Sequence, residues 1–165
     1  MIRPVKTTDA KLICGIYNHY ISNTIITFEE EPVTAKEMKI RIEEVASKFP
    51  WLVYEENSEL AGYAYLTNWR TRSSYRYTAE STVYLKENYR GKGIGAALYH
   101  ALIEKSKNLS LHSLIGGIAL PNNASIALHE KLNFKKVAHF QQVGYKFNQW
   151  VDVGYWQLLL EPNAS

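Results

Sequence analysis

The chain has 165 residues, of which 46% are hydrophobic and 13% aromatic, and its formal net charge is +3. This composition is typical of one folded domain over residues 1–165 and excludes a disordered chain. Because no segment is dominated by Lys and Arg, we expect no nucleic-acid partner. The single cysteine, Cys14, excludes an internal disulfide and a Cys-rich metal site, and no metal is expected. Without an apolar run that suits a membrane span or a signal peptide, we expect a cytoplasmic location and no membrane partner.

The first third of the chain predicts one short strand and two helices. Residues 2–5 read as the strand, and Asp9 can cap a helix behind it. Thr34 and Glu37 form a Thr-x-x-Glu capping box for a second helix that ends near residue 47. The first helix carries apolar residues at helical spacing, which predicts a buried face. They are Leu12, Ile13, Ile16, Tyr17 and Tyr20.

The remaining elements are mostly strands. A hairpin, a long β-branched and aromatic strand, a helix, a buried strand, a second helix and two closing strands are expected in that order. Their ranges are 51–56 with 60–69, 74–85, 93–107, 113–120, 122–132, 134–143 and 150–160. The order predicts a mixed α+β fold around one sheet.

Three glycines, Gly91, Gly93 and Gly95, stand at every second position where the third helix should begin. Glycine destabilises a helix interior by up to about 1 kcal/mol relative to alanine, so these positions need a reason. The first N–H groups of a helix lack partners and face the positive end of its dipole, and glycine lets a phosphate approach the backbone. With the positive charges of Arg90 and Lys92, the stretch predicts a diphosphate cradle. A glycine-rich turn before an ordinary helix is the alternative.

The spacing Arg90-x-x-Gly93-x-Gly95 resembles the acetyl-CoA signature Arg/Gln-x-x-Gly-x-Gly/Ala of the GNAT N-acetyltransferases. The resemblance implies a central, mostly antiparallel seven-stranded sheet with about four helices and a V-shaped split between strands 4 and 5. Four longer blocks look like the phosphinothricin N-acetyltransferase branch, which acetylates phosphinothricin, methionine sulfoximine and related amino acids. They are "TAESTVYL", "YRGKGIGAALYHALI", "HSLIGGIALPNNASIALHEKLNF" and "VGYKFNQWVDVGYWQL". The chain departs from that branch at Asn133, where Gly usually follows Leu.

On the donor side, the resemblance implies acetyl-CoA as co-substrate. The backbone of Val83 and Leu85, with Tyr84 between them, would bond the pantetheine amides like an added strand. A β-bulge there would free an N–H to polarise the thioester carbonyl. Asn122 resembles the asparagine that bonds the CoA arm, and Asn123 competes for that role. The expected diphosphate cradle consists of Arg90, Gly91, Lys92, Gly93, Ile94, Gly95 and Ala96.

On the acceptor side, Glu80 is the only acidic residue within its expected strand. Strand alternation would place Arg76, Thr78 and Glu80 on one face. A structural ion pair between Glu80 and Arg76 and a general base at Glu80 are both consistent with that pattern. The resemblance places the catalytic acid in "TAES" and favours the base. It also implies that the segment with Arg76, Tyr77 and Thr78 anchors the acceptor.

Three further positions follow from the resemblance. Phe28 would wall the acceptor pocket, and Lys146 would close it; a core aromatic and a hairpin residue are the alternatives. Many GNAT enzymes have a Tyr at the place of His129, near the leaving thiolate. His129 could therefore be the general acid, and a buried histidine at a helix–sheet contact is the alternative.

The sequence thus predicts an acetyl-CoA-dependent N-acetyltransferase that acts by direct transfer on a small amino acid or analogue, with herbicide or antibiotic resistance as a possible consequence. A protein N-terminal or lysine acetyltransferase of the same fold and a non-enzymatic CoA-binding module are the alternatives. The family and the aromatic closing strands also lead us to expect a homodimer.

Overall fold

The computed structural model describes residues 1–161, and one mixed sheet of seven strands organises it. The strand order is β1-β2-β3-β4-β5-β7-β6, and every neighbouring pair is antiparallel except β4 with β5. The strands are β1 Ile2–Pro4, β2 Trp51–Glu56, β3 Glu59–Asn68, β4 Thr78–Leu85, β5 Ser113–Leu120, β6 Lys135–Lys146 and β7 Gln149–Leu159. The predicted fold class is confirmed.

Four helices accompany the sheet: α1 Ala10–Asn23, α2 Ala35–Ala46, α3 Ile94–Lys107 and α4 Asn123–Lys131. The predicted capping box of α2 is present, because Thr34 Oγ1 accepts from the Glu37 amide and the Glu37 carboxylate accepts from the Thr34 amide. The prediction for Asp9 is wrong in detail. Its carboxylate does not cap α1 but accepts hydrogen bonds from the Lys6 amide and the Arg3 guanidinium. Within the described chain, no helix has the length and apolar character that a bilayer crossing requires.

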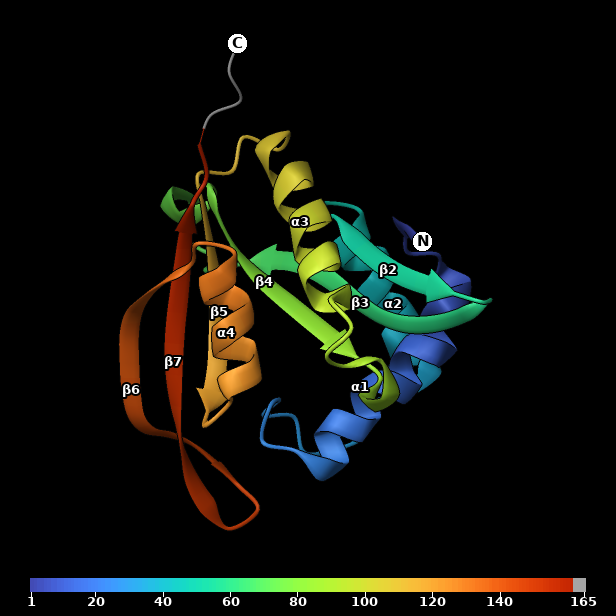
Figure 1. Ribbon diagram of the computed structural model, residues 1–165, viewed down its shortest axis with the longest axis horizontal. Helices are drawn as coiled ribbons and strands as arrows, with labels where there is room; N and C mark the ends of the chain where they lie inside the picture. Colours follow the sequence, from blue (N-terminus) through green and yellow to red (C-terminus); the bar gives the residue numbers. More distant parts are fainter. Residues whose placement is uncertain (162–165) are drawn as a thin grey trace.

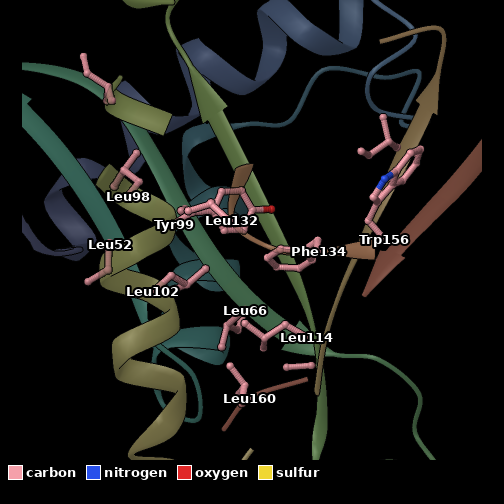
Figure 2. Packing of buried hydrophobic residues seen from close by; sticks show 14 of the residues in the cluster. Leu52, Leu66, Leu98, Tyr99, Leu102, Leu114, Leu132, Phe134, Trp156 and Leu160 are labelled. Carbon is pink, nitrogen blue, oxygen red and sulfur yellow. The ribbon is translucent and has the colours of Figure 1, made fainter. Parts of the chain in front are cut away.

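The helices cover the sheet on two faces, each with its own core. Figure 1 shows α3 and α4 in front of the strands, with α2 behind β2 and β3. Under α3 and α4 lies one cluster, where Leu98 and Leu102 of α3 meet Leu66 of β3 and Leu114 of β5 (Figure 2). The second cluster joins α1 and α2 to the opposite face. Leu12 is the exception to the predicted apolar face of α1, since half of its surface is exposed.

The split between β4 and β5 is the feature that positions the site. The two strands pair only at Thr78 with Ser113, Ala79 with Leu114, and Glu80 with Ile115. Beyond Glu80 they diverge, as Figure 1 shows. The backbone groups of β4 past Glu80 therefore face an open gap on the β5 side, which confirms the predicted V-shaped split.

The start of β4 differs from the prediction. The expected strand at 74–85 begins only at Thr78, because residues Ser73–Tyr75 form a short 3₁₀ helix and Arg76 follows it in a turn. The Tyr77 carbonyl accepts from the amides of His112 and Ser113, so this turn locks onto the start of β5 instead of extending the strand. Arg76 therefore does not share a strand face with Glu80.

Candidate active site

The backbone conformation of the glycine loop explains why glycine stands at two of its three positions. Gly91 and Gly93 have φ angles of +74° and +79°, a region that side-chain-bearing residues rarely adopt. Gly93 is the N-cap of α3, and the bond from the Ala97 amide to the Gly93 carbonyl (3.0 Å) opens the helix. The amides just before Ala97 thus lack intrahelical acceptors and point out of the helix start. The third glycine, Gly95, serves packing, because a Cβ there would crowd the Leu128 side chain.

A cavity of about 390 Å³ opens in front of this helix start. Arg90, Gly91, Gly93, Gly95, Ala96 and Asn122 line it together with residues of α4. The Arg90 guanidinium lies 5.2 Å from the centre of the Tyr20 ring. Bare amides, a helix N-terminus and a guanidinium are what a diphosphate requires, so the residues that line this cavity fit a cradle. Two predicted members do not line it: the Lys92 ammonium lies 4.9 Å from the centre of the Tyr89 ring, and Ile94 is buried in the core.

The outer edge of β4 supplies backbone groups to the same region. The Lys86 amide bonds to the Ala61 carbonyl of β3, and the register runs from there to Asn68 with Ala79 without a shift. By antiparallel alternation, Tyr84 bonds toward β3, whereas Val83 and Leu85 point into the split. The Tyr20 hydroxyl already donates to the Leu85 carbonyl (2.6 Å) and accepts from its amide (3.3 Å). Alternation rather than a bulge thus frees the backbone of Val83.

The two candidate asparagines are separated by the structure. The Asn122 side chain caps α4 by accepting from the Ser125 amide at 3.1 Å, and Asn122 lines both cavities of the split. Asn123 is exposed and lines neither. The predicted cap is therefore Asn122.

A second cavity, of about 400 Å³, lies beside the first and contains Glu80 at the apex of the split. Glu80 lies on the face of β4 that is turned toward α1 and α2, because Tyr84, four residues on and therefore on the same face, packs against Tyr17 and Tyr20. Burial raises the pKa of the Glu80 carboxyl, and the positive charge of Arg70 partly offsets this rise. A carboxylate with a raised pKa in a cavity has the character of a general base.

On the other face of the sheet, under α3 and α4, hydrogen bonds connect a chain of polar groups at the split. The Ser125 carbonyl lies 2.7 Å from His129 Nδ1, so Nδ1 bears the proton and Nε2 is the acceptor in the neutral ring. The Tyr99 hydroxyl lies 3.0 Å from His129 Nε2 and 3.3 Å from the Ser81 hydroxyl. Burial lowers the pKa of His129, which keeps the ring neutral at pH 7. Sequence reasoning missed Tyr99, whose spacing indicates only a core position.

The predicted acceptor residues fall into two groups. Phe28 lines the Glu80 cavity, whereas Arg76, Tyr77, Thr78 and Lys146 do not. Arg76 donates to the Ser73 carbonyl (3.0 Å) and stacks on Tyr77, which is half exposed. Lys146 is buried, and its ammonium donates to the Thr27 carbonyl at 2.7 Å.

Arg70 is the cation whose field reaches Glu80 and Tyr155 of this cavity. Arg70, Arg72 and Arg76 all lie between β3 and β4, and nothing in the sequence distinguishes the arginine whose charge reaches Glu80. Within residues 1–161, no group of three His, Cys, Asp or Glu side chains could hold a metal ion.

Comparisons with known proteins agree with this geometry. The model of the GNAT acetyltransferase domain matches residues 2–154. Phosphinothricin N-acetyltransferase of Streptomyces viridochromogenes is 37% identical over 156 residues, which is 94% of this chain and 85% of that protein. The L-methionine sulfoximine/L-methionine sulfone acetyltransferase of Pseudomonas aeruginosa is 36% identical over 166 residues, with 99% and 96% covered.

Two solved structures superpose closely. A Salmonella typhimurium protein solved with its cofactor acetyl-CoA has a TM-score of 0.96 and 35% identity, with 100% of this chain and 96% of that chain covered. A phosphinothricin acetyltransferase from Sinorhizobium meliloti, in complex with acetyl-CoA, has a TM-score of 0.95 and 32% identity, with 100% and 91% covered. Together with the glycine cradle and the split sheet, these matches show that the chain belongs to the GNAT family of acetyltransferases.

Proposed function

We propose that the protein transfers the acetyl group of acetyl-CoA to the amino group of a small amino acid or analogue. The observation that carries the proposal is the position of Glu80, a carboxylate with a raised pKa at the apex of the split. Glu80 and Phe28 line one cavity, which shares Val83, Asn122 and Ser125 with the cavity in front of the glycine loop. Relatives named for phosphinothricin and for methionine sulfoximine support this class of acceptor.

In this proposal Glu80 takes a proton from the acceptor's ammonium group, which leaves a neutral amine. The Val83 amide, turned into the split, donates to the thioester carbonyl while the N–C bond forms. In the resting protein the Tyr99 hydroxyl donates to His129 Nε2, which holds it beside the split. As the C–S bond breaks, the Tyr99 O–H turns from Nε2 and donates a hydrogen bond to the leaving sulfur. Glu80 keeps the first proton, the acceptor nitrogen gives its second proton to solvent as the amide forms, and coenzyme A leaves as the thiolate, so atoms and charges balance without a covalent enzyme intermediate.

This assignment changes the expected role of His129. A histidine that donates a proton to the thiolate would need a proton on Nε2, where the structure places the Tyr99 hydroxyl. Because burial lowers the pKa of His129, that protonated form is disfavoured at neutral pH. His129 is then a positioning residue for Tyr99, and Arg70, whose charge acts on Glu80, is the cation that would attract an acceptor's carboxylate or phosphinate.

A thiol-release assay tests the function on free amino acids, methionine sulfoximine, phosphinothricin, a peptide N-terminus and a lysine peptide. We expect transfer to at least one free amino acid, and Glu80→Gln should lower the rate several-hundredfold with unchanged CoA affinity in calorimetry. Glu43→Gln, on the exposed side of α2, is the control. Gly93→Asp should abolish CoA binding, because its carboxylate would face the diphosphate.

The other outcomes identify the alternatives. Transfer to peptides alone would identify a protein acetyltransferase, and CoA binding without transfer to any amine would identify a binding module. Full activity of Glu80→Gln would remove Glu80 from the mechanism.

We also propose that two copies of the chain associate through the β6–β7 hairpin. Several large apolar side chains on it are half exposed or more: Val137, Phe140, Val143, Tyr145, Phe147 and Trp150. Figure 1 shows the turn of this hairpin reaching beyond the helices, where a second hairpin could cover these side chains. Sedimentation velocity gives the mass directly, and a monomer would contradict this association.

A further inference from the structure

The loop between α1 and α2, residues 24–34, forms one wall of the Glu80 cavity through Ile26, Thr27 and Phe28. Side chains of α1 and α2 hold one side of this loop by hydrogen bonds. The Tyr17 hydroxyl lies 2.9 Å from Thr27 Oγ1, and Arg41 donates two hydrogen bonds, of 2.8 and 2.7 Å, to the Glu29 carboxylate. The position of the wall over the cavity then depends on what holds its other side.

That other side is tied to the β6–β7 hairpin by a buried lysine. The Lys146 ammonium donates to the Thr27 carbonyl at 2.7 Å, and only 2% of the residue's surface is exposed. Burial lowers the pKa of Lys146, so placing this cation here costs free energy. The bond joins segments 119 residues apart in the sequence, and Figure 1 shows the α1–α2 loop approaching the hairpin.

A second contact joins the same two segments next to the lysine. The Phe28 ring covers the backbone of Gly144 so closely that a Cβ on Gly144 would overlap two of its ring carbons, Cζ and Cε2. Gly144 is buried, and its neighbour Val143 lines the Glu80 cavity beside Phe28. Only glycine at position 144 lets the aromatic ring lie where it does.

We propose that Lys146 and Gly144 are positioning residues of the acceptor site: they fix the Phe28 wall on the hairpin and so give the cavity its acceptor-binding shape. This inference rests on the proposed function. Neither residue touches the reacting atoms, and neither lies near the glycine loop that holds the donor. Their loss should therefore weaken acceptor binding and leave donor binding intact.

The experiment uses Lys146→Met and Gly144→Ala with the free amino acid or analogue that the wild-type protein acetylates best. We expect KM for the acceptor to rise at least fivefold in each variant, with KM for acetyl-CoA within twofold of wild type. Calorimetric titration of the acceptor into the CoA-bound protein should show the same loss. Matched controls are Lys11→Met and Gly15→Ala, both on exposed positions of α1 and without expected effect.

A double variant separates positioning from general damage. With the ring removed in Phe28→Ala, the methyl group of Gly144→Ala meets no obstacle, so it should add no further loss of acceptor affinity. The proposal is overturned if the acceptor KM stays unchanged, if both KM values rise together, or if the two losses simply add. If wild type acetylates no free amino acid, the proposed function fails first and this inference with it.

Discussion

Gly116→Ala is the substitution that tests the polar chain at the split most directly. Gly116 lies in β5 where the His129 ring of α4 packs onto the strand. A Cβ at this position would lie 2.8 Å from His129 Cδ2 and closer still to Nε2. To reach an ordinary contact, the ring must retreat by about 1 Å.

The retreat has a calculable consequence. His129 Nε2 lies 3.0 Å from the Tyr99 hydroxyl, so a further 1 Å or so breaks that hydrogen bond. The ring has little freedom, because Nδ1 is held by the Ser125 carbonyl at 2.7 Å and Phe134 packs edge-on at 5.1 Å between ring centres. Overpacking typically costs about 1–3 kcal/mol and a lost hydrogen bond about 1 kcal/mol. We expect the free energy of unfolding to fall by about 2–4 kcal/mol in total.

Activity should fall as well, since Tyr99 loses its orienting partner. A loss of about 1.4 kcal/mol in transition-state stabilisation corresponds to tenfold in kcat. Urea unfolding followed by fluorescence measures the first effect, and steady-state kinetics measure the second. Gly15→Ala, in open space on α1, is the control.

A double-mutant cycle of Gly116→Ala with His129→Ala tests whether the loss comes from the clash with the imidazole ring or from any substitution in this part of β5. Once the imidazole is removed, the added methyl group meets no ring, so Gly116→Ala should cost almost nothing in that background. An equal cost in both backgrounds would refute the proposed clash. A normal kcat in Gly116→Ala would show that the His129–Tyr99 bond does not serve the reaction.

Two further predictions concern charges. Because the Arg70 charge lowers the pKa of Glu80, Arg70→Met should raise that pKa, and the acid limb of the kcat/KM profile should move to higher pH; an unmoved limb would separate Arg70 from Glu80. Burial alone would raise the pKa of Asp9, but the bonds from Arg3 and the Lys6 amide hold it below its usual value. A lowered pKa in the folded state gives stability that is present at neutral pH and lost as pH falls through that pKa. Asp9→Asn should therefore lose about 1–3 kcal/mol at pH 7, with the difference from wild type closing below about pH 4. A gap that persists in acid would point to packing rather than charge.

The parts of the fold that sequence reasoning predicted correctly are those encoded locally. The Thr34–Glu37 capping box, the hairpin at 51–68 and the glycine loop depend on residues within a few positions of one another. The resemblance then supplied the split and the role of Glu80, which no local pattern contains. The role of Glu80 still awaits its kinetic test.

The start of β4 shows where local reasoning stops. Residues 74–77 have the aromatic and polar alternation of a strand, yet the Tyr77 carbonyl bonds to two amides at the beginning of β5. A contact across some 35 residues of chain, which include β4 and α3, overrides the local preference. For the same reason, local sequence patterns do not predict the hydrogen bond from Lys146 to Thr27 or the one from Tyr20 to Leu85, because neither pair is close in sequence.

Asn133 is where the chain departs from the family pattern, and the structure explains why the departure is tolerated. Its φ is +67°, the left-handed conformation for which glycine is usual and asparagine is the next best residue. The amides of Asn133 and Phe134 bond to the carbonyls of Glu130 and His129, both at 3.0 Å, which is a Schellman turn at the end of α4. The turn fixes the backbone of His129 and brings Phe134 against its ring. The placement of the imidazole at the split therefore depends on this backbone shape, which asparagine supplies as glycine does.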